Sequence, residues 1–137
     1  MTQLARRFSS FRAGQHLPLQ LALSTGESFI ERTYSLSNSP TDEYYRISVK
    51  RDNKGIGSQH LHDAIQVGDV IQAKKTNGDF LLKFPARPVV LISAGIGVTP
   101  LVSILHFAIQ TEVGGPIHFF TGFVMAIMRL CWKKFEP

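Results

Sequence analysis

The chain contains a single cysteine, Cys131, among its 137 residues. One thiol cannot close a disulfide within the chain, and no cysteine-ligated iron–sulfur cluster or zinc site can be assembled from it. A long hydrophobic run is missing as well, because the most apolar stretch, residues 117–130, is too short to span a bilayer and contains Gly122 and Arg129. The N-terminus lacks the apolar segment of a secretory signal. We therefore expect a cytoplasmic protein with no membrane span and no metal site.

Acidic residues are in the minority, with 10 Asp and Glu against 15 Lys and Arg, for a formal net charge of +5. A basic surface attracts nucleic acid, anionic membranes or acidic proteins. The basic residues are scattered, however, and no aromatic platform accompanies them, so a nucleic-acid-binding domain is supported by charge alone. The phosphates of a bound dinucleotide account for part of this charge, and we expect no nucleic-acid partner.

Short strands separated by turns are predicted for the first half of the chain. The expected strands cover residues 16–23, 28–37, 44–50, 70–73 and 80–82. Four leucines alternate on one face of the first of them. A short helix is expected over residues 58–65, with Ser58 as its N-cap. Its inward-facing residues are Leu61, Ala64 and Ile65. This spacing predicts a small antiparallel barrel or sandwich over residues 1–86.

The composition changes after a linker at residues 84–88, where two prolines interrupt regular structure. Residues 89–92 form a continuous apolar run, which is typical of a strand buried on both faces of a parallel sheet. A glycine loop then leads into a helix predicted over residues 100–110, with Thr99 as its N-cap. Residues 117–120 are predicted to be the next parallel strand. The pattern predicts one strand–loop–helix–strand unit over residues 88–122.

Arg32, Tyr34 and Ser35 stand together near the end of the second predicted strand. An arginine is a permanently charged, bidentate clamp for a phosphate, and a tyrosine offers an aromatic face and a hydroxyl. A serine hydroxyl can both donate and accept a hydrogen bond, as a redox-active ring nitrogen requires. The alternative is an exposed strand whose arginine and serine face water.

A second motif, Gly95-x-Gly97-x-Thr99-Pro100, lies between the buried strand and the following helix. Glycines permit a tight turn and a close approach of the backbone to a pyrophosphate, and Thr99 adds a hydroxyl. The motif differs from the six-residue dinucleotide fingerprint because Pro100 stands where a third glycine is expected. The alternative is a plain strand–helix turn capped by threonine.

In this order, the two motifs resemble the two nucleotide sites of the ferredoxin–NADP reductase-like flavoprotein family. The resemblance covers residues 11–122 and is closest to the reductase portion of flavohaemoglobins and of oxygenase reductases. Those proteins pass electrons from NAD(P)H through FAD to an acceptor protein or domain. The resemblance implies a small antiparallel Greek-key β-barrel, which binds FAD, followed by an incomplete parallel α/β nucleotide-binding unit over residues 87–137.

The resemblance also implies which residues form the sites. Tyr34 and Ser35 are expected to meet the reacting flavin ring. The flavin-binding residues are expected to be Arg32, Thr33, Tyr34, Ser35, Ser48, Val49, Lys50, Gly57 and Ser58. The residues expected to meet NAD(P)H are Gly95, Gly97, Thr99 and Pro100.

The sequence departs from the family pattern at both ends, and these departures leave alternative functions open. Few residues precede the segment that matches the family's early strands, and residues 123–137 match nothing expected. We therefore expect a chain truncated at both ends, and an inert flavin-binding fragment is the rival to a working oxidoreductase. FMN could replace FAD, since only the turn at Gly57 and Ser58 favours the pyrophosphate of FAD. The choice between NADH and NADPH stays open.

Overall fold

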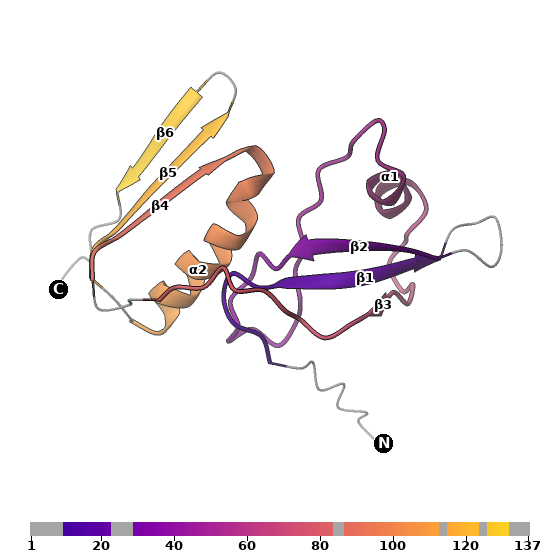
Figure 1. Cartoon of the computed structure of the whole chain (residues 1–137), viewed down its shortest axis with the longest axis horizontal. Coiled ribbons are helices and arrows are strands. Elements are labelled where there is room, and N and C mark those ends of the chain that lie inside the picture. The colour runs from indigo at the N-terminus through magenta and orange to yellow at the C-terminus, as the bar shows by residue number, and fades with distance from the viewer. Residues whose placement is uncertain (1–9, 23–28, 84–86, 113–114, 124–125, 132–137) are drawn as a thin grey trace.

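Two antiparallel pairings build the first sheet. In the computed structural model of the protein, which describes residues 10–22, 29–83, 87–112, 115–123 and 126–131, strand β1 covers His16–Ala22. It pairs antiparallel with β2, Phe29–Ser35, on one edge and with the short β3, Gln72–Ala73, on the other. Helix α1, Ile56–Asp63, lies on the same side of the molecule as this sheet (Figure 1). The predicted antiparallel first half is confirmed.

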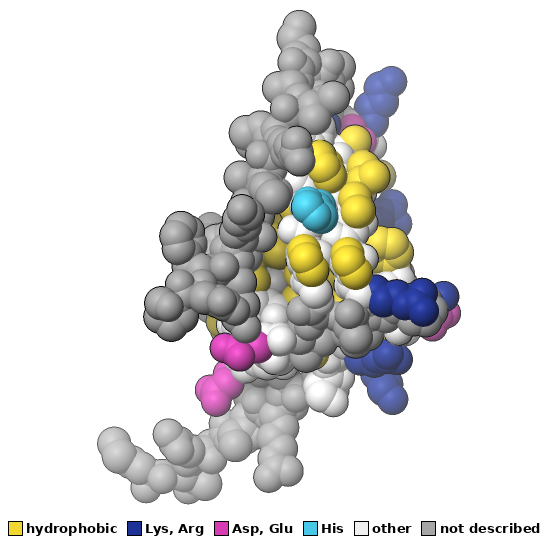
Figure 2. All heavy atoms as spheres, turned by 90° about the vertical axis from the view of Figure 1, so that its left-hand side faces the viewer, with side chains coloured by type: hydrophobic (Ala, Val, Ile, Leu, Met, Phe, Trp, Pro, Cys, Tyr) yellow, Lys and Arg dark blue, Asp and Glu magenta, His cyan; other side chains and the backbone are white. Residues whose placement is uncertain are grey.

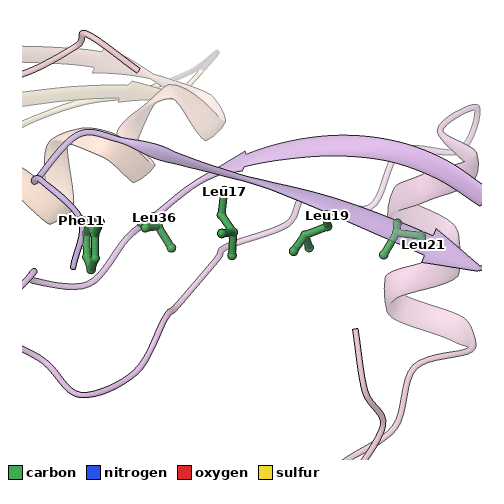
Figure 3. Close-up of a cluster of buried hydrophobic side chains, with 5 residues drawn as sticks. All are labelled: Phe11, Leu17, Leu19, Leu21 and Leu36. Carbon is green, nitrogen blue, oxygen red and sulfur yellow. The ribbon is translucent and has the colours of Figure 1, made fainter. Parts of the chain in front are cut away.

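The alternating leucines of β1 form the inner face of this sheet. Leu17, Leu19 and Leu21 point to the same side (Figure 3) and join Phe11 and Leu36 in one buried cluster. Leu21 is 1% exposed and Leu36 is 0% exposed, so the centre of this cluster is sealed from water. Alternation places every second side chain on one face of a strand, which explains why the prediction succeeded for these three leucines. Leu23, the fourth predicted leucine, lies outside the described residues.

A parallel strand pair forms the second sheet. Strand β4, Val89–Ala94, pairs in parallel with β5, Ile117–Phe123, and helix α2, Val98–Gln110, connects them. Strand β6, Ala126–Cys131, pairs antiparallel with the other edge of β5. Helix α2 packs on one face of this sheet, where the buried residues are Ala13, Leu91, Leu101, Ile104 and Phe119. The predicted strand–helix–strand unit is confirmed.

The opposite face of the second sheet is open to solvent along β4. Val90 is 56% exposed and Ile92 is 74% exposed, while Leu91 between them is buried under α2. Figure 2 looks onto this side and shows hydrophobic side chains gathered around a histidine. The prediction that residues 89–92 are buried on both faces is therefore wrong, because only one helical layer covers this sheet among the described residues.

Three predicted strands are shorter than expected or absent. Residues 44–50 form only an isolated antiparallel bridge between Leu36 and Ile47, although their half-buried and exposed side chains alternate as predicted. Only the last two residues of the strand predicted at 70–73 pair, and Val70 is 81% exposed. No strand forms at 80–82, where Phe80 is exposed. Of residues 123–137, which match nothing expected in the family, residues 124–125 and 132–137 lie outside the described part of the chain.

Both helices begin earlier than predicted. The N-cap of α1 is Gly55, so Ser58 lies inside the first turn, and Ala64, which we predicted to face inward, is exposed beyond the helix end. The N-cap of α2 is Gly97, because a 3-10 turn, η1 (Gly95–Gly97), runs directly into the helix. Thr99 is thus not the N-cap. Leu61 does pack against the first core, as expected.

A buried hydrogen bond joins the two halves of the fold. The Ser103 hydroxyl on α2 donates to the Asn38 carbonyl oxygen at 2.6 Å, and both residues are 0% exposed. Ala13, from the segment before β1, belongs to the core beneath α2. In the part of the chain that the structure describes, neither helix has the length and apolar character needed to cross a bilayer.

Candidate functional site

Arg32 lies against the first turn of α1. Strand register places it opposite Leu19, and its Nη1 atom donates to the Glu31 carbonyl oxygen at 2.8 Å. A Cβ atom added at Gly57 would lie only 2.7 Å from the Arg32 Cγ atom. Gly57 must therefore be small for the arginine side chain to pass over the helix. A guanidinium group and the N-terminus of a helix, both of which attract anions, meet at this point.

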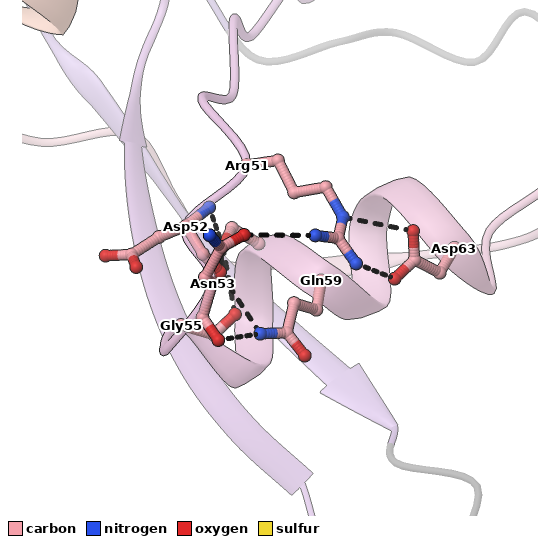
Figure 4. Close-up of polar contacts among 7 residues, drawn as sticks. Arg51, Asp52, Asn53, Gly55, Gln59 and Asp63 are labelled. Atoms are coloured by element: carbon pink, nitrogen blue, oxygen red, sulfur yellow. Dashed lines mark hydrogen bonds and ion pairs between the residues drawn. The ribbon is translucent and has the colours of Figure 1, made fainter.

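The turn before α1 is held by its own polar groups. The Ser58 hydroxyl accepts from the Asp52 amide at 3.0 Å and donates to the Gly55 carbonyl oxygen at 2.9 Å. The Gln59 side chain donates to the Asn53 carbonyl oxygen at 2.7 Å (Figure 4). Ser58 thus stabilises the turn that presents Gly57, which is a different local role from the N-cap predicted for it.

An exposed ion pair fixes the same turn to the far end of α1. Arg51 Nη2 donates to Asp63 Oδ2 at 2.7 Å, and Arg51 Nε donates to Asp63 Oδ1 at 3.3 Å (Figure 4). This hydrogen bonding, with the positive charge of Arg51, holds the pKa of the Asp63 carboxyl below its ordinary value. The ion pair thus links the segment before the predicted pyrophosphate turn, at Arg51, to the end of α1, at Asp63.

Tyr34 and Ser35 end β2 with different surroundings. Tyr34 is half-buried against the first core, and this burial raises the pKa of its hydroxyl, while the nearby Arg32 charge acts in the opposite direction. Ser35 pairs with His16 and, by strand alternation, projects to the other face from Tyr34. Thr33, also predicted for this site, is exposed.

The bridge between Leu36 and Ile47 brings the next predicted site residues alongside the end of β2. The Ser37 amide donates to the Arg46 carbonyl oxygen at 2.8 Å, and the Ser37 and Ser48 hydroxyl oxygens are 3.1 Å apart. An antiparallel register continued by one residue sets Ser35 opposite Ser48.

The remaining predicted flavin residues differ in exposure. Val49 is half-buried, and its carbonyl oxygen accepts from His62 Nε2 at 2.9 Å, which ties this segment to α1. Lys50 is exposed. The predicted flavin residues thus gather along β2, the 48–50 segment and the start of α1.

The second predicted loop, Gly95–Gly97, is open. Gly95 has a φ of +55°, a left-handed conformation that favours glycine, whereas Gly97 has a φ of −61° that any residue adopts. A Cβ atom added at either glycine would meet no protein atom within 4 Å. The backbone conformation at Gly97 therefore does not require a glycine, and the position that a side chain would occupy is open.

The residues around this loop are more buried. Thr99 is 7% exposed, and its hydroxyl donates to the Ile96 carbonyl oxygen at 3.1 Å, while Pro100 is half-buried in the first turn of α2. Sequence reasoning missed Ser93, whose buried hydroxyl oxygen has no hydrogen-bond partner among the described residues. A serine near the end of an otherwise apolar strand was the available signal. This unpaired hydroxyl lies on β4, two residues before the open glycine loop.

Comparison with known proteins places this geometry in a family. Residues 3–81, more than half of the chain, match the family model described as the oxidoreductase FAD-binding domain. The flavohemoprotein of Deinococcus radiodurans is 41% identical over 110 residues, which is 80% of this chain and 27% of that protein. The flavohemoprotein of Bacillus subtilis is 42% identical over 103 residues, covering 74% of this chain and 25% of that protein. The chain thus spans about a quarter of the length of these relatives.

Solved structures show the same likeness. The flavohem-like FAD/NAD binding domain of nitric oxide dioxygenase from Vibrio cholerae superposes with a TM-score of 0.77 at 35% identity, covering 84% of this chain and 50% of that one. Phthalate dioxygenase reductase superposes with a TM-score of 0.75 at 28% identity, covering 88% of this chain and 36% of that one. The chain belongs to the oxidoreductase FAD-binding domain family and has the fold of the ferredoxin–NADP reductase-like flavoproteins.

Proposed function

We propose that this chain binds FAD along β2 and the start of α1, takes hydride from NAD(P)H, and passes electrons to an acceptor protein or domain. Residues 1–86 would form the flavin-binding unit and residues 87–137 the dinucleotide-binding unit. The observation that carries the proposal is the contact between Arg32 and Gly57. It joins a permanent positive charge to a helix N-terminus, a pairing suited to a pyrophosphate.

The residues of the first site fit a flavin in distinct ways. Arg32 would clamp the phosphates, with the backbone of Gly57 and Ser58 completing the clamp. Tyr34 would offer its ring face, and Ser35 a hydroxyl that can donate or accept at the redox-active nitrogen. Ser48 and Val49 would line the ring, and Thr33 and Lys50 would flank the site. FAD itself supplies the capacity to accept a hydride and release single electrons. The protein contributes orientation and charge.

The second site fits a nicotinamide dinucleotide. Gly95 and Gly97 leave space for a pyrophosphate to approach the backbone, and Thr99 and Pro100 set the start of α2 beside it. Among the structural relatives, phthalate dioxygenase reductase is described as transferring electrons from pyridine nucleotides to a [2Fe-2S] centre. A ferredoxin–NADP+ reductase from Neisseria gonorrhoeae, 25% identical with a TM-score of 0.65, has bound FAD and NADP. A cytoplasmic location would give the chain access to this cofactor pool.

Replacing Arg32 tests the proposal. Losing a charge-assisted contact typically costs about 1.5–3 kcal/mol, so Arg32→Ala should weaken FAD binding by about ten- to hundred-fold. Arg32 is exposed, so circular dichroism should stay unchanged. Arg12→Ala removes another exposed arginine outside the site and should leave FAD affinity alone. Equal FAD affinity in wild type and Arg32→Ala would show that Arg32 is only a solvated strand residue. An FMN titration in parallel decides between the two flavins.

A second candidate, a flavin-binding fragment without turnover, is favoured by the exposed sheet face at Val90 and Ile92. Parallel sheets are ordinarily covered on both faces, and a half-covered dinucleotide unit would bind its ligand poorly. Dye reduction with NADH and with NADPH separates the two candidates. A yellow protein that reduces no dye with either dinucleotide supports the fragment, whereas turnover with either supports the oxidoreductase.

A further inference from the structure

A pocket lies where the loop after β2 meets the C-terminal half of α2. Its volume is about 270 Å³, and it is lined by Asp42, Tyr44, Arg46, His106, Ile109 and Gln110. None of these residues belongs to either candidate cofactor site. Pockets for drug-sized ligands typically measure about 300–1,000 Å³. This pocket therefore suits a molecule with a single ring and excludes a whole flavin or dinucleotide.

Buried hydrogen bonds fix the pocket wall that the loop contributes. The Asn38 side chain donates to the Tyr44 carbonyl oxygen at 2.6 Å and accepts from the Arg46 amide at 2.9 Å. The Asn38 carbonyl oxygen accepts from Ser103 of α2 at 2.6 Å. The buried Asn38 thus fixes the conformation of the loop through its side chain and attaches the loop to α2 through its carbonyl oxygen. The wall is formed before any ligand arrives, which lowers the entropic cost of binding.

The acceptor groups at the rim are already engaged within the protein. Asp42 Oδ2 accepts from the Ser39 amide at 3.1 Å, and Asp42 Oδ1 lies 3.5 Å from the Gln110 Nε2 donor. Gln110 Oε1 accepts from the Thr41 hydroxyl at 2.6 Å. The one carboxylate and the one side-chain amide oxygen of the pocket therefore each accept at least one hydrogen bond from the protein itself.

The remaining polar groups are donors. Arg46 Nη2 donates to the Ser37 carbonyl oxygen at 2.7 Å and lies 3.4 Å from His106 Nδ1. Both contacts use the same nitrogen, and no described residue takes the hydrogens of Arg46 Nε or Nη1. Because a guanidinium only donates, this contact is a hydrogen bond only in the tautomer whose Nδ1 accepts, and in that tautomer Nε2 carries the proton and is a donor. The pocket therefore presents free donors and a permanent positive charge to an anion.

The other two lining residues are largely apolar and accessible. Tyr44 is 50% exposed and Ile109 is 42% exposed. We propose that this pocket binds a small aromatic carboxylate, with the carboxylate on Arg46 and His106 and the ring against Tyr44 and Ile109. A planar carboxylate matches the guanidinium plane, and an aromatic ring gains from contact with both an aromatic and an aliphatic side chain.

Such a ligand would touch both halves of the fold. Tyr44 and Arg46 belong to the loop after β2, whereas His106 and Ile109 belong to α2. Occupancy would add contacts across the junction that sets the flavin-binding half against the dinucleotide-binding half. None of the pocket's lining residues belongs to the proposed flavin site, so the pocket would bind its ligand whether or not the chain carries a flavin.

Titration with sodium benzoate at constant ionic strength, followed by two-dimensional NMR, tests the pocket. We expect saturable shifts at Tyr44, His106 and Ile109 with a dissociation constant of about 1 mM. Acetate, which lacks the ring, and inorganic phosphate should bind at least about tenfold more weakly. Arg46→Gln should weaken benzoate binding by about ten- to hundred-fold. Arg12→Gln, which removes an exposed arginine outside the pocket, should not change it.

A second variant keeps the test decisive if Arg46→Gln disturbs the loop. Ile109→Glu adds a negative charge at an exposed pocket position that makes no side-chain hydrogen bond, so the fold should survive while benzoate binding is lost. The proposal is overturned by an absence of saturable shifts up to about 10 mM. It is equally overturned by acetate or phosphate binding as tightly as benzoate, or by benzoate binding unchanged in a folded Ile109→Glu variant.

Discussion

The glycines that begin the two helices differ in what surrounds them. At α1, a Cβ atom added to Gly55 or Gly57 would collide with Ser58 or Arg32 at 2.8 Å and 2.7 Å. At α2, the same addition at Gly95 or Gly97 meets nothing within 4 Å. The first turn is filled by the protein's own side chains, whereas the second is left empty. A glycine thus permits close packing in one loop and leaves open space in the other.

The two hydrophobic cores also differ, because the first is more completely enclosed by the protein than the second. The first encloses Leu21 and Leu36 completely, while the second sheet buries Leu91 on one face and exposes Ile92 on the other. We expect the first half to carry more of the stability of the fold, and the second to depend more on what binds to it.

The largest expected effect contrasts these two cores. Leu36→Ala should lower the free energy of unfolding by about 3 kcal/mol, because it removes a fully buried leucine and leaves a cavity. Ile92→Ala, at a 74% exposed position, should change it by less than about 0.5 kcal/mol. Urea unfolding followed by circular dichroism measures both. Similar losses in the two variants would mean that the outer face of the second sheet is covered in solution.

The next effect concerns the crowded helix start. Gly57→Ala should push the Arg32 side chain away from α1 and weaken FAD binding by about tenfold. The fold should survive, because alanine favours a helix over glycine by about 1 kcal/mol. In an Arg32→Ala background the same change should have no effect on FAD affinity, since the collision is gone. Additive losses in the double variant would contradict the contact.

A smaller effect is expected at the open helix start. Gly97→Ala should raise the free energy of unfolding by about 0.5 kcal/mol, because its φ suits alanine and no atom is in the way. NAD(P)H binding should nevertheless weaken, as a methyl group would occupy the space beside the backbone. Gly95→Ala is the matched control and should destabilise the fold, because its φ is positive. Calorimetry measures the stability and the NAD(P)H affinity of both variants. An NAD(P)H affinity that is unaltered in Gly97→Ala would refute the ligand interpretation.

The smallest effect is electrostatic. The Asp63 pKa is lower in the folded chain, so its pairing with Arg51 stabilises the fold above the ordinary pKa of an aspartate, about 3.9. This contribution is lost as the pH falls through the lowered value. Wild type and Arg51→Gln should therefore differ slightly in urea midpoint at neutral pH and converge in acid. A difference that persists below the folded-state pKa would assign the effect of Arg51 to packing.

The sequence predicted the regular parts of the fold better than the junctions between them. Leucine alternation located β1, and the apolar run with its glycine loop located the β4–α2 connection. The 44–50 segment alternates equally well, yet it makes only one bridge, because strand formation depends on a partner that the local pattern does not contain.

Both helix starts were misplaced for one reason. Ser58 and Thr99 carry the residue types preferred at N-caps, but each hydroxyl donates to the carbonyl oxygen three residues earlier, Gly55 and Ile96 respectively. This back-bonding inside the first turn resembles a capping signal, but it occurs three residues after the true N-cap in α1 and two residues after it in α2. The pocket beside His106 could not be predicted, since it depends on segments that meet only in the folded chain. Ser93 did have a sequence signal, a serine near the end of an otherwise apolar strand.

The hydrogen bond from Ser103 to Asn38 bears on any attempt to exchange halves between this chain and its relatives in the FAD-binding domain family. A chimaera that brings its second half from a homologue with alanine at position 103 would leave the buried Asn38 carbonyl without its donor. Such an orphaned group typically costs about 1–3 kcal/mol. Compatibility of grafted halves would then depend on this single residue pair more than on overall identity, which gives a simple rule for choosing donors in recombination libraries.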